Sequence, residues 1–263
     1  MSLTLNEAPQ KFREFYGGNV EQMPKLIAEG RIPLSVAGLM QRRLDVRNAS
    51  SEVKSSWMDN YFDTGDAVVY HPDGRVTIVL DSQTLREMTP ESPRDKGALI
   101  LGEDVYNALK GEEFKKGKLG KVNESLSRED VKAHPVWKVL ARDQGLLNDY
   151  VDYIFSEGKQ KFGYDTAMGI YPDSASDKPK LRAWCVSRLG GRSNALGRLD
   201  LDEDYGRFLG IAPEALSAIR KGASNIKTYT MAELQAADKA MKGLEGILNP
   251  DILKPLLELR KKL

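Results

Sequence analysis

The stretch from Gly65 to Ser82, GDAVVYHPDGRVTIVLDS, restricts the possible fold more than any other part of the sequence. Two runs rich in valine and isoleucine flank a Pro-Asp-Gly turn at 72–74. Because proline fixes φ at the first turn position and glycine tolerates the later one, this pattern predicts a β-hairpin. The ALIL run at 98–101 predicts a further strand.

Helical patterns surround this hairpin. Apolar residues recur at helical spacing, which predicts helices over 7–16, a segment ending at 29–30, 36–46, 52–61, 103–109 and 135–157. Ser35 is the candidate N-cap of the third of these. Beyond Pro213 further helices are expected, one of them opened by a capping box at 230–233.

Two helices, a glycine-containing turn and three arginines near residue 45 allow two interpretations. Arg42, Arg43 and Arg47 would suit a helix-turn-helix that contacts DNA. The alternative is a helical hairpin whose arginines face water. The alternative is favoured, because helical hairpins are far commoner than DNA readers.

A charged, glycine-broken segment from Lys110 to Asn123 suggests a boundary. Its basic run KKGKLGK is interpreted as solvated linker rather than as a phosphate contact. We therefore predict an α+β fold in which helices pack on small antiparallel sheets, in two subdomains at 1–111 and 128–263. The two parts either stand apart or share one continuous sheet.

Composition narrows the class of protein. The 263 residues hold 39 Lys and Arg against 38 Asp and Glu, so any attraction to nucleic acid must come from a local patch. A single cysteine excludes an internal disulfide and zinc clusters built on several cysteines. No signal-peptide pattern and no apolar run of membrane-spanning length occurs. We expect a soluble cytoplasmic protein that does not enter membranes.

The densest mix of arginine, glycine and carboxylate lies between Tyr164 and Ile211. Strands are predicted over 166–171 and 181–189, paired antiparallel across a Pro/Ser/Asp-rich loop. Alternation places Trp184 between Arg182 and Arg188 on one face. If that face is open, the indole can stack on a base or a phosphorylated ring. The favoured alternative buries Trp184 under the 135–157 helix, with the arginines reaching past it to water.

The loop at 188–198, RLGGRSNALGR, is the first candidate for a ligand site. Glycines let backbone amides converge on an anion, and the polar side chains add donors. The spacing matches neither the phosphate-loop nor the dinucleotide pattern, and Gly-Gly after a strand also means an ordinary turn. The candidate ligand-binding residues are seven residues of this loop and the tryptophan on the preceding strand: Arg188, Gly190, Gly191, Arg192, Ser193, Asn194, Arg198 and Trp184.

Alternate aspartates follow this loop. Asp200, Asp202 and Asp204 could gather a hard cation such as Mg²⁺ or Ca²⁺, but a calcium loop requires glycine at its sixth position and a carboxylate at its twelfth. Tyr205 and Ile211 stand there instead. A helix start capped by Asp202 is the simpler interpretation.

Two catalytic patterns are weaker still. The Asp-Thr-Gly at 63–65 resembles that of aspartic proteases, but a single copy lacks the second carboxylate, and a polar turn before the hairpin explains it better. Cys185 with His71 or His134 would make a nucleophile–base pair. A cysteine in the middle of a strand is more typical of a buried thiol.

The leading functional hypothesis is a binding protein whose 188–198 loop grips a phosphate-bearing partner, either nucleic acid or a phosphorylated small molecule. The first alternative is a metal-dependent enzyme acting on a phosphoester, with the three aspartates as ligands. The second is a structural or assembly subunit without a small ligand. The sequence names no cofactor and does not set the oligomeric state.

Overall fold

The computed structural model describes residues 3–5, 11–174, 177–204 and 206–212. The helices predicted beyond Pro213 and most of the first half of the helix predicted over 7–16 lie outside these ranges. Residues 1–215 belong to one compact unit of the chain, and everything below concerns that unit.

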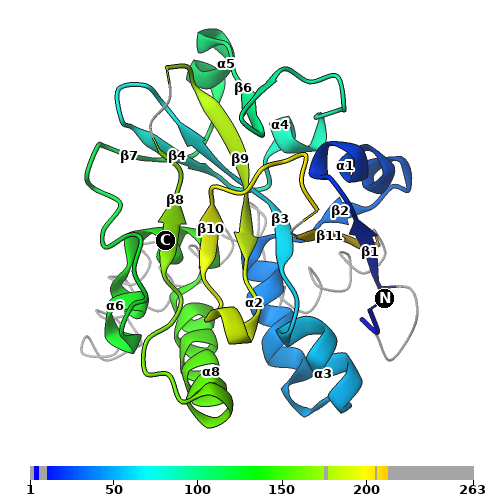
Figure 1. The fold of residues 1–263 in the computed structure, drawn as a ribbon, viewed down its shortest axis with the longest axis vertical. Coiled ribbons are helices and arrows are strands. Elements are labelled where there is room, and N and C mark those ends of the chain that lie inside the picture. The colour runs from blue at the N-terminus through cyan, green and yellow to red at the C-terminus, as the bar shows by residue number, and fades with distance from the viewer. Residues whose placement is uncertain (1–2, 6–10, 175–176, 205, 213–263) are drawn as a thin grey trace, which may run out of the picture. The chain divides into compact units, whose positions relative to one another are not determined.

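Eleven strands of the described chain join in one mixed sheet (Figure 1). Its main path runs β1-β11-β3-β9-β10-β8, and the remaining strands attach to β11, β3, β9 or one another. The strands are β1 (Phe12–Tyr16), β2 (Ile32–Pro33), β3 (Phe62–Tyr70), β4 (Val76–Val79), β5 (Arg94–Asp95), β6 (Ala98–Ile100), β7 (Glu112–Phe114), β8 (Ile170–Pro172), β9 (Lys180–Val186), β10 (Ala195–Gly197) and β11 (Arg207–Ile211).

The prediction of small antiparallel sheets was wrong. The sheet is large, and β11 pairs with β3 and β10 with β8 in parallel. Its first and last described strands lie side by side, with Phe15 opposite Phe208. Hydrophobic alternation marks a strand but not its partner, so pairing between residues nearly 200 positions apart leaves no local signal.

Strands on both sides of the predicted 111/128 boundary take part in this sheet. β6 pairs with β9, where Leu99 lies opposite Leu181. β7 falls inside the predicted linker and pairs with β4. Of the two arrangements that the sequence left open, the structure therefore has the shared sheet.

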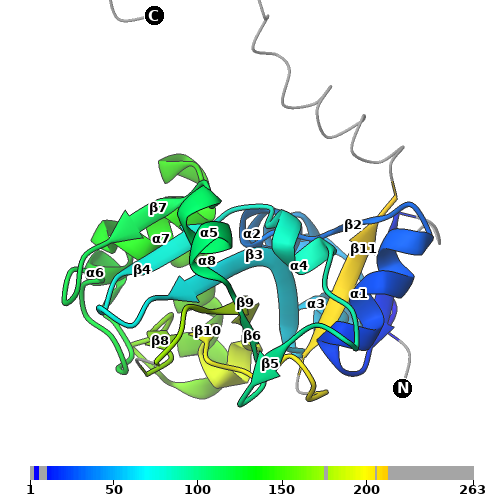
Figure 2. The same ribbon diagram turned by 90° about the horizontal axis from the view of Figure 1, so that it is seen from above.

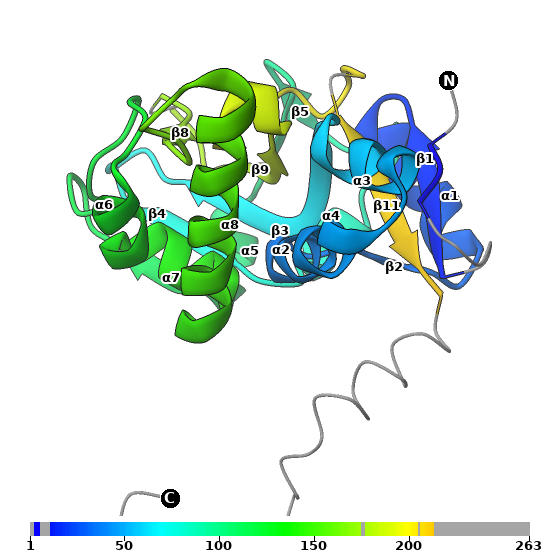
Figure 3. The ribbon, with the colours of Figure 1, turned by 90° about the horizontal axis from the view of Figure 1, so that it is seen from below.

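Eight α-helices of the described chain form two groups. One group joins α2 (Val36–Asp45), α3 (Ser51–Met58), α6 (Arg128–Ala133), α7 (Pro135–Ala141) and α8 (Gln144–Phe162) through mutual contacts. Figure 1 shows α2, α3, α6 and α8 in its lower half. α1 (Asn19–Ala28) and α4 (Gln83–Arg86) contact each other, and α5 (Glu103–Ala108) follows β6. Figure 3 shows α8 beside α7 and α2 from the opposite side to Figure 2.

Local signals predicted several elements correctly. The β3–β4 hairpin turns at His71–Arg75, where the His71 amide donates to the Arg75 carbonyl. The Ser35 hydroxyl caps α2 by accepting from the Gly38 amide, as predicted. The helices that end near 29, cover 52–61 and cover 103–109 are present as α1, α3 and α5 within a few residues.

Other predicted elements need correction. Residues 12–16 form β1 rather than a helix, because their aromatic side chains pair across the sheet with β11. The long helix over 135–157 is two helices, divided at Arg142, whose φ of 62° is left-handed. The proposed 166–171/181–189 pair does not form, because β10 lies between β8 and β9.

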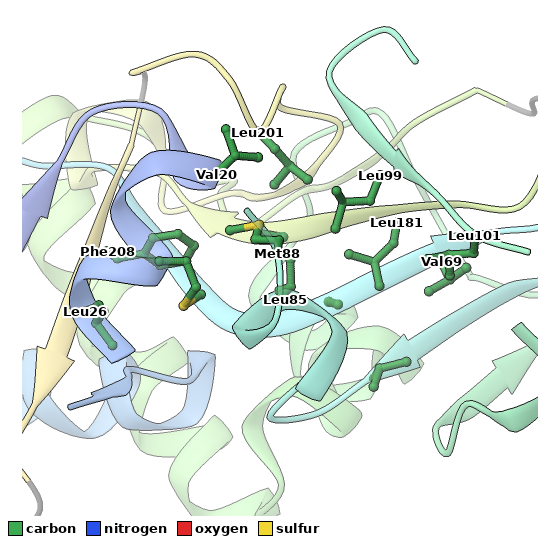
Figure 4. Close-up of a cluster of buried hydrophobic side chains, with 14 of the residues drawn as sticks. Val20, Leu26, Val69, Leu85, Met88, Leu99, Leu101, Leu181, Leu201 and Phe208 are labelled. Carbon is green, nitrogen blue, oxygen red and sulfur yellow. The ribbon is translucent and has the colours of Figure 1, made fainter. Parts of the chain in front are cut away.

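One apolar cluster lies between the sheet and the helices α1, α4 and α5 (Figure 4). It joins residues distant in sequence, such as Val20, Val69, Leu85, Leu181 and Phe208. Burying apolar surface contributes about 25 cal/mol of stability for each Å² removed from water. This cluster therefore helps to hold the first and last described elements against the strands between them.

Candidate functional site

The 188–198 loop is anchored from below by a buried arginine. Arg43 of α2 has 0% exposure and donates to the carbonyls of Trp57, Asn60 and Ser187. It also donates to the hydroxyls of Tyr150 at 2.9 Å and Ser193 at 3.4 Å. Among the described residues no carboxylate pairs with Arg43. Neither expected role, a DNA contact or a water-facing arginine, fits this residue.

Four consecutive backbone amides of the loop, 191–194, donate within the protein. Gly191 and Ser193 donate to the Arg188 carbonyl, and Arg192 donates to that of Leu189. The Asn194 amide donates to the Ser187 hydroxyl at 2.8 Å. A short 3₁₀ turn, η2 (Leu189–Gly191), results. These amides therefore form an ordinary turn, and they do not point together at a ligand.

Three polar side chains of the loop also point inward. Ser193 is buried beside Arg43. The Asn194 side chain accepts from the Gly169 amide at 2.8 Å and donates to the Gly191 carbonyl. Arg192 donates to the Thr166 hydroxyl at 2.9 Å and lies over the Tyr164 ring. These groups shape the loop and tie it to the chain before β8.

Trp184 offers no surface to a ligand, because only 1% of the residue is exposed. Gly197 lies so close to this indole that a Cβ there would stand 3.1 Å from it. Burial of the indole, one part of the alternative weighed from the sequence, matches the structure, whereas the arginine of that alternative at 182 does not reach water because it is 3% exposed.

Arg182 is buried as well, and its guanidinium cross-links several segments of the chain. Its guanidinium pairs with Asp173 and Asp200, each at 2.7 Å. It also donates to the carbonyls of Lys96 and Leu199. This guanidinium joins β9 to three loops, those after β8, between β5 and β6, and after β10, so it fixes loops rather than meeting a partner.

The three aspartates proposed as metal ligands take separate partners. Asp200 accepts from Arg182, Asp202 lies 3.7 Å from Arg94, and Asp204 accepts from the Tyr16 hydroxyl. Across the described ranges, no three His, Cys, Asp or Glu side chains are grouped to hold a metal ion. Residues 201–203 form a turn, so the predicted helix start at Asp202 was wrong.

The only cysteine meets a carboxylate rather than a histidine. Cys185 hydrogen-bonds Asp63, and burial raises the pKa of its thiol well above the ordinary value. Burial also raises the pKa of Asp63 to about 6. His134 contacts the Lys121 carbonyl, whereas His71 contacts Asp73 and Glu103. Neither histidine is paired with the thiol in these contacts.

The Asp-Thr-Gly segment is part of β3 rather than a polar turn before it. Thr64 donates to the Trp184 carbonyl, and Asp66 accepts from the Val36 and Asp81 amides. Arg142 completes the Asp66 site at 2.7 Å. The register shifts between Asp63 and Ala67, so this segment is a bulge whose polar groups are satisfied internally.

Two arginines of the loop, Arg188 and Arg198, are exposed to solvent. The Arg188 side chain is exposed and makes no ion pair or side-chain hydrogen bond with the described residues. Arg198 is exposed over the Tyr171 ring. They stand beyond opposite ends of the β9–β10 pair, because Val186 pairs with Ala195 and Cys185 with Leu196. The loop therefore has two separate cationic ends.

An aromatic ring accompanies the Arg188 end. Phe162, the last residue of α8, is 52% exposed and stacks on Tyr164 with 6.0 Å between ring centroids and 4° between planes. A Cβ at the exposed Gly190 would stand 3.3 Å from the Phe162 ring. Phe162 was not among the residues predicted from the sequence, although an aromatic directly before the helix-ending Gly163 was a usable signal.

Comparisons with known proteins address the fold alone. The sequence matches no family model and no curated protein. One solved structure is similar, described as "Accommodation of massive sequence variation in Nanoarchaeota by the C-type lectin fold". The match covers 79% of this chain and 100% of that chain, with a TM-score of 0.59 and 17% identity.

The fold of this chain, with its large mixed sheet and helices, therefore resembles the C-type lectin fold. Such a likeness sets the arrangement of strands and helices and assigns no ligand. Among the described helices, none combines the length and apolar character needed to cross a bilayer.

Proposed function

We propose that this chain is a binding protein whose Arg188 end contacts a ligand that carries a flat ring and a phosphate. We name the face formed by Phe162, Arg188 and Gly190 the ring–arginine face. A nucleotide unit, free or within a single strand of nucleic acid, has the matching chemistry. The observation that carries the proposal is an exposed aromatic ring against the same loop that presents an arginine without an ion pair.

Each component has a defined part in this proposal. Phe162 supplies an exposed ring, and its partner Tyr164 is held by a hydroxyl bond to the Leu189 carbonyl at 2.9 Å. Base–aromatic stacking contributes about 1–3 kcal/mol for each base. Arg188 supplies a cation that meets phosphate without first breaking a pair. Gly190 packs close to the ring, since a Cβ there would stand 3.3 Å from it, and so holds the loop against Phe162.

This proposal keeps part of the sequence hypothesis and changes the rest. Arg188 and Gly190 remain candidate contacts, whereas Phe162 replaces the buried Trp184 as the stacking group. Gly191, Arg192, Ser193 and Asn194 support the loop from within. Arg198 belongs to the other end of the strand pair.

The test is an equilibrium titration of fluorescently labelled oligo-dT, with ATP as unlabelled competitor. Phe162→Ala and Arg188→Ala should each weaken binding about tenfold or more, and Arg188→Ala should also reduce the salt dependence. Competition by ATP would assign a free nucleotide, and its absence would assign a strand.

Arg198→Ala is the matched control, because it removes an exposed arginine at the other end of the same strands. Arg198→Ala should change the affinity for oligo-dT by no more than about twofold, which is less than the loss expected when one phosphate contact is removed. Wild-type affinity in both the Phe162 and Arg188 variants, or no binding by the parent chain, would refute the proposal.

A further inference from the structure

A second aromatic residue, Tyr61, lies at the turn that carries the ring–arginine face. Phe62 of β3 pairs with Val186 of β9, so Tyr61, the residue before β3, lies at the same end of the sheet as Arg188. β9 lies between β3 and β10 in this sheet (Figure 2). Figure 3 shows the 189–191 turn, in yellow, beside α8. The turn is therefore bordered both by α8 and by the start of β3.

The two glycines of this turn lie against different aromatic side chains. A Cβ on Gly190 would stand 3.3 Å from the Phe162 ring, and a Cβ on Gly191 would stand 3.1 Å from the Tyr61 hydroxyl. Because consecutive Cα atoms are about 3.8 Å apart, the Phe162 ring and the Tyr61 hydroxyl lie within about 13 Å of each other. Both side chains are thus within reach of one ligand at the turn.

The Tyr61 hydroxyl makes no hydrogen bond with the described residues. The next polar group at Gly191 is the Ser187 hydroxyl, 3.2 Å from the same Cβ position. That hydroxyl is already used, since it donates to the Gly191 carbonyl and accepts from the Asn194 amide. Tyr61 is partly exposed. Its hydroxyl is therefore a donor that a ligand at the turn can use.

The charges around this turn attract a ligand with several negative charges. The two lysines in the last turn of α8 already pair with carboxylates. Arg188 and Arg192 make no ion pair with the described residues. The exposed Asp59, two positions before Tyr61, accepts from the Ser55 hydroxyl. Two uncompensated guanidinium groups against this one carboxylate suit a chain of phosphates.

A single strand of nucleic acid can use these groups together. Its bases stack on aromatic rings, and its phosphates recur along the chain. Arg188 can pair with one phosphate while the Tyr61 hydroxyl donates to another, since tyrosine hydroxyls are among the usual donors to phosphate oxygens. A nucleoside monophosphate offers one phosphate, so it leaves one of these two positions empty.

We infer that the ring–arginine face binds a single strand of nucleic acid rather than a free nucleotide, and that the Tyr61 hydroxyl donates to a second phosphate of that strand. This inference rests on the function proposed above, to which it adds a contact and a choice between the two forms of ligand. DNA and RNA share the chemistry on which it depends.

The experiment compares Tyr61→Phe with the parent chain in titrations of labelled oligo-dT about ten nucleotides long, with thymidine 5′-monophosphate as competitor. This substitution removes the hydroxyl and keeps the ring. The affinity for the strand should fall about three- to tenfold, as expected for one hydrogen bond, and the affinity for the monophosphate should not change. A parallel series with oligo-U distinguishes RNA from DNA as the source of the strand.

Salt dependence separates a lost hydrogen bond from a lost charge. Tyr61→Phe changes no charge, so the slope of log affinity against log salt should stay at the value of the parent chain. Arg188→Ala should reduce that slope by about 1. A reduced slope in Tyr61→Phe would contradict a direct contact through a neutral hydroxyl.

Tyr171→Phe is the matched control. Tyr171 is also partly exposed, and its hydroxyl also makes no hydrogen bond with the described residues. Its ring lies beside Arg198, at the other end of the β9–β10 pair. Tyr171→Phe should bind the strand with the affinity of the parent chain. Thermal melts of both tyrosine variants should match the parent, because neither hydroxyl is bonded within the described chain.

Two results would overturn this inference and leave the proposed function intact. One is undiminished binding of the strand by Tyr61→Phe while Phe162→Ala and Arg188→Ala weaken it. The other is an equal loss for strand and monophosphate, which would place the hydroxyl on the same nucleotide as the ring. Wild-type affinity in both Phe162→Ala and Arg188→Ala would instead refute the proposed function itself.

Discussion

The arginines of this protein divide into an interior set and a surface set, although all look alike in the sequence. Arg43 and Arg182 are buried, and each forms four or more hydrogen bonds to neighbouring elements. Arg188 and Arg198 stand at the two ends of a strand pair and are exposed. The buried arginines therefore hold the 188–198 loop in place, and the exposed arginines lie at the two ends of that loop.

The largest expected effect comes from the interior set. Arg43→Met should lower the free energy of unfolding by about 3–5 kcal/mol, because it leaves buried carbonyls and the Tyr150 hydroxyl without their donor. Urea unfolding followed by circular dichroism measures this loss. Arg47→Met, at an exposed position just beyond α2, should change stability by less than about 0.5 kcal/mol. Equal losses in the two variants would contradict the division.

Asp63, a buried acid of β3, gives the next largest effect, with the opposite sign. Burial raises the pKa of Asp63 from 3.8 to about 6, and Asp63 is 3% exposed. Its contribution to stability is complete below pH 3.8 and declines as pH rises to about 6. At about 1.4 kcal/mol for each pH unit between these values, the protein loses about 3 kcal/mol.

Asp63→Asn should remove this pH dependence. The variant should match the parent chain near pH 4 and exceed its stability by up to about 3 kcal/mol at pH 8. The Asn19 side-chain oxygen has no partner among the described residues and can accept the new amide. Urea midpoints at the two pH values measure the difference, and a variant less stable at pH 8 would contradict this account.

Asp66→Asn sharpens the Asp63 prediction as a matched control. Burial raises the pKa of Asp66 as it does that of Asp63, but Asp66 also accepts from two backbone amides and from Arg142, and an asparagine cannot replace all of these bonds. Its replacement should cost about 2–3 kcal/mol at pH 8, where Asp63→Asn stabilises. The two aspartates are three positions apart, and their variants should move stability in opposite directions.

The smallest expected effects separate neighbours within the loop. Arg192→Ala should cost about 1 kcal/mol, because it removes the bond to Thr166 and the contact with Tyr164. Arg188→Ala should leave stability within about 0.5 kcal/mol. Thermal melts compare them, and a larger loss for Arg188 than for Arg192 would mean that the surface assignment is wrong.

Local chemistry in the sequence predicted the elements whose signals are complete within a few residues. The turn at 72–74 and the Ser35 cap are such cases, since proline, glycine and serine act on their nearest neighbours. The β1–β11 pair and the insertion of β10 beside β9 were not predictable in this way. They depend on which distant strands share the core.

The candidate site was predicted in part for the same reason. Spacing placed Arg188 and Gly190 in a loop after a strand, which the structure contains. Burial of Arg43, Arg182 and Trp184 depends on helices and loops far along the chain, so alternation alone could not decide it. The mixed sheet, not the strand pattern, determines which polar side chains reach solvent.

An NMR titration of ¹⁵N-labelled protein with ATP or oligo-dT tests the central claim most directly, because it locates a ligand without any substitution. The account predicts that amide shifts concentrate at Phe162, Arg188 and Gly190, with little change at Arg198, when either ATP or oligo-dT is added. Shifts centred on Arg198, or none with either millimolar ATP or oligo-dT, would contradict it.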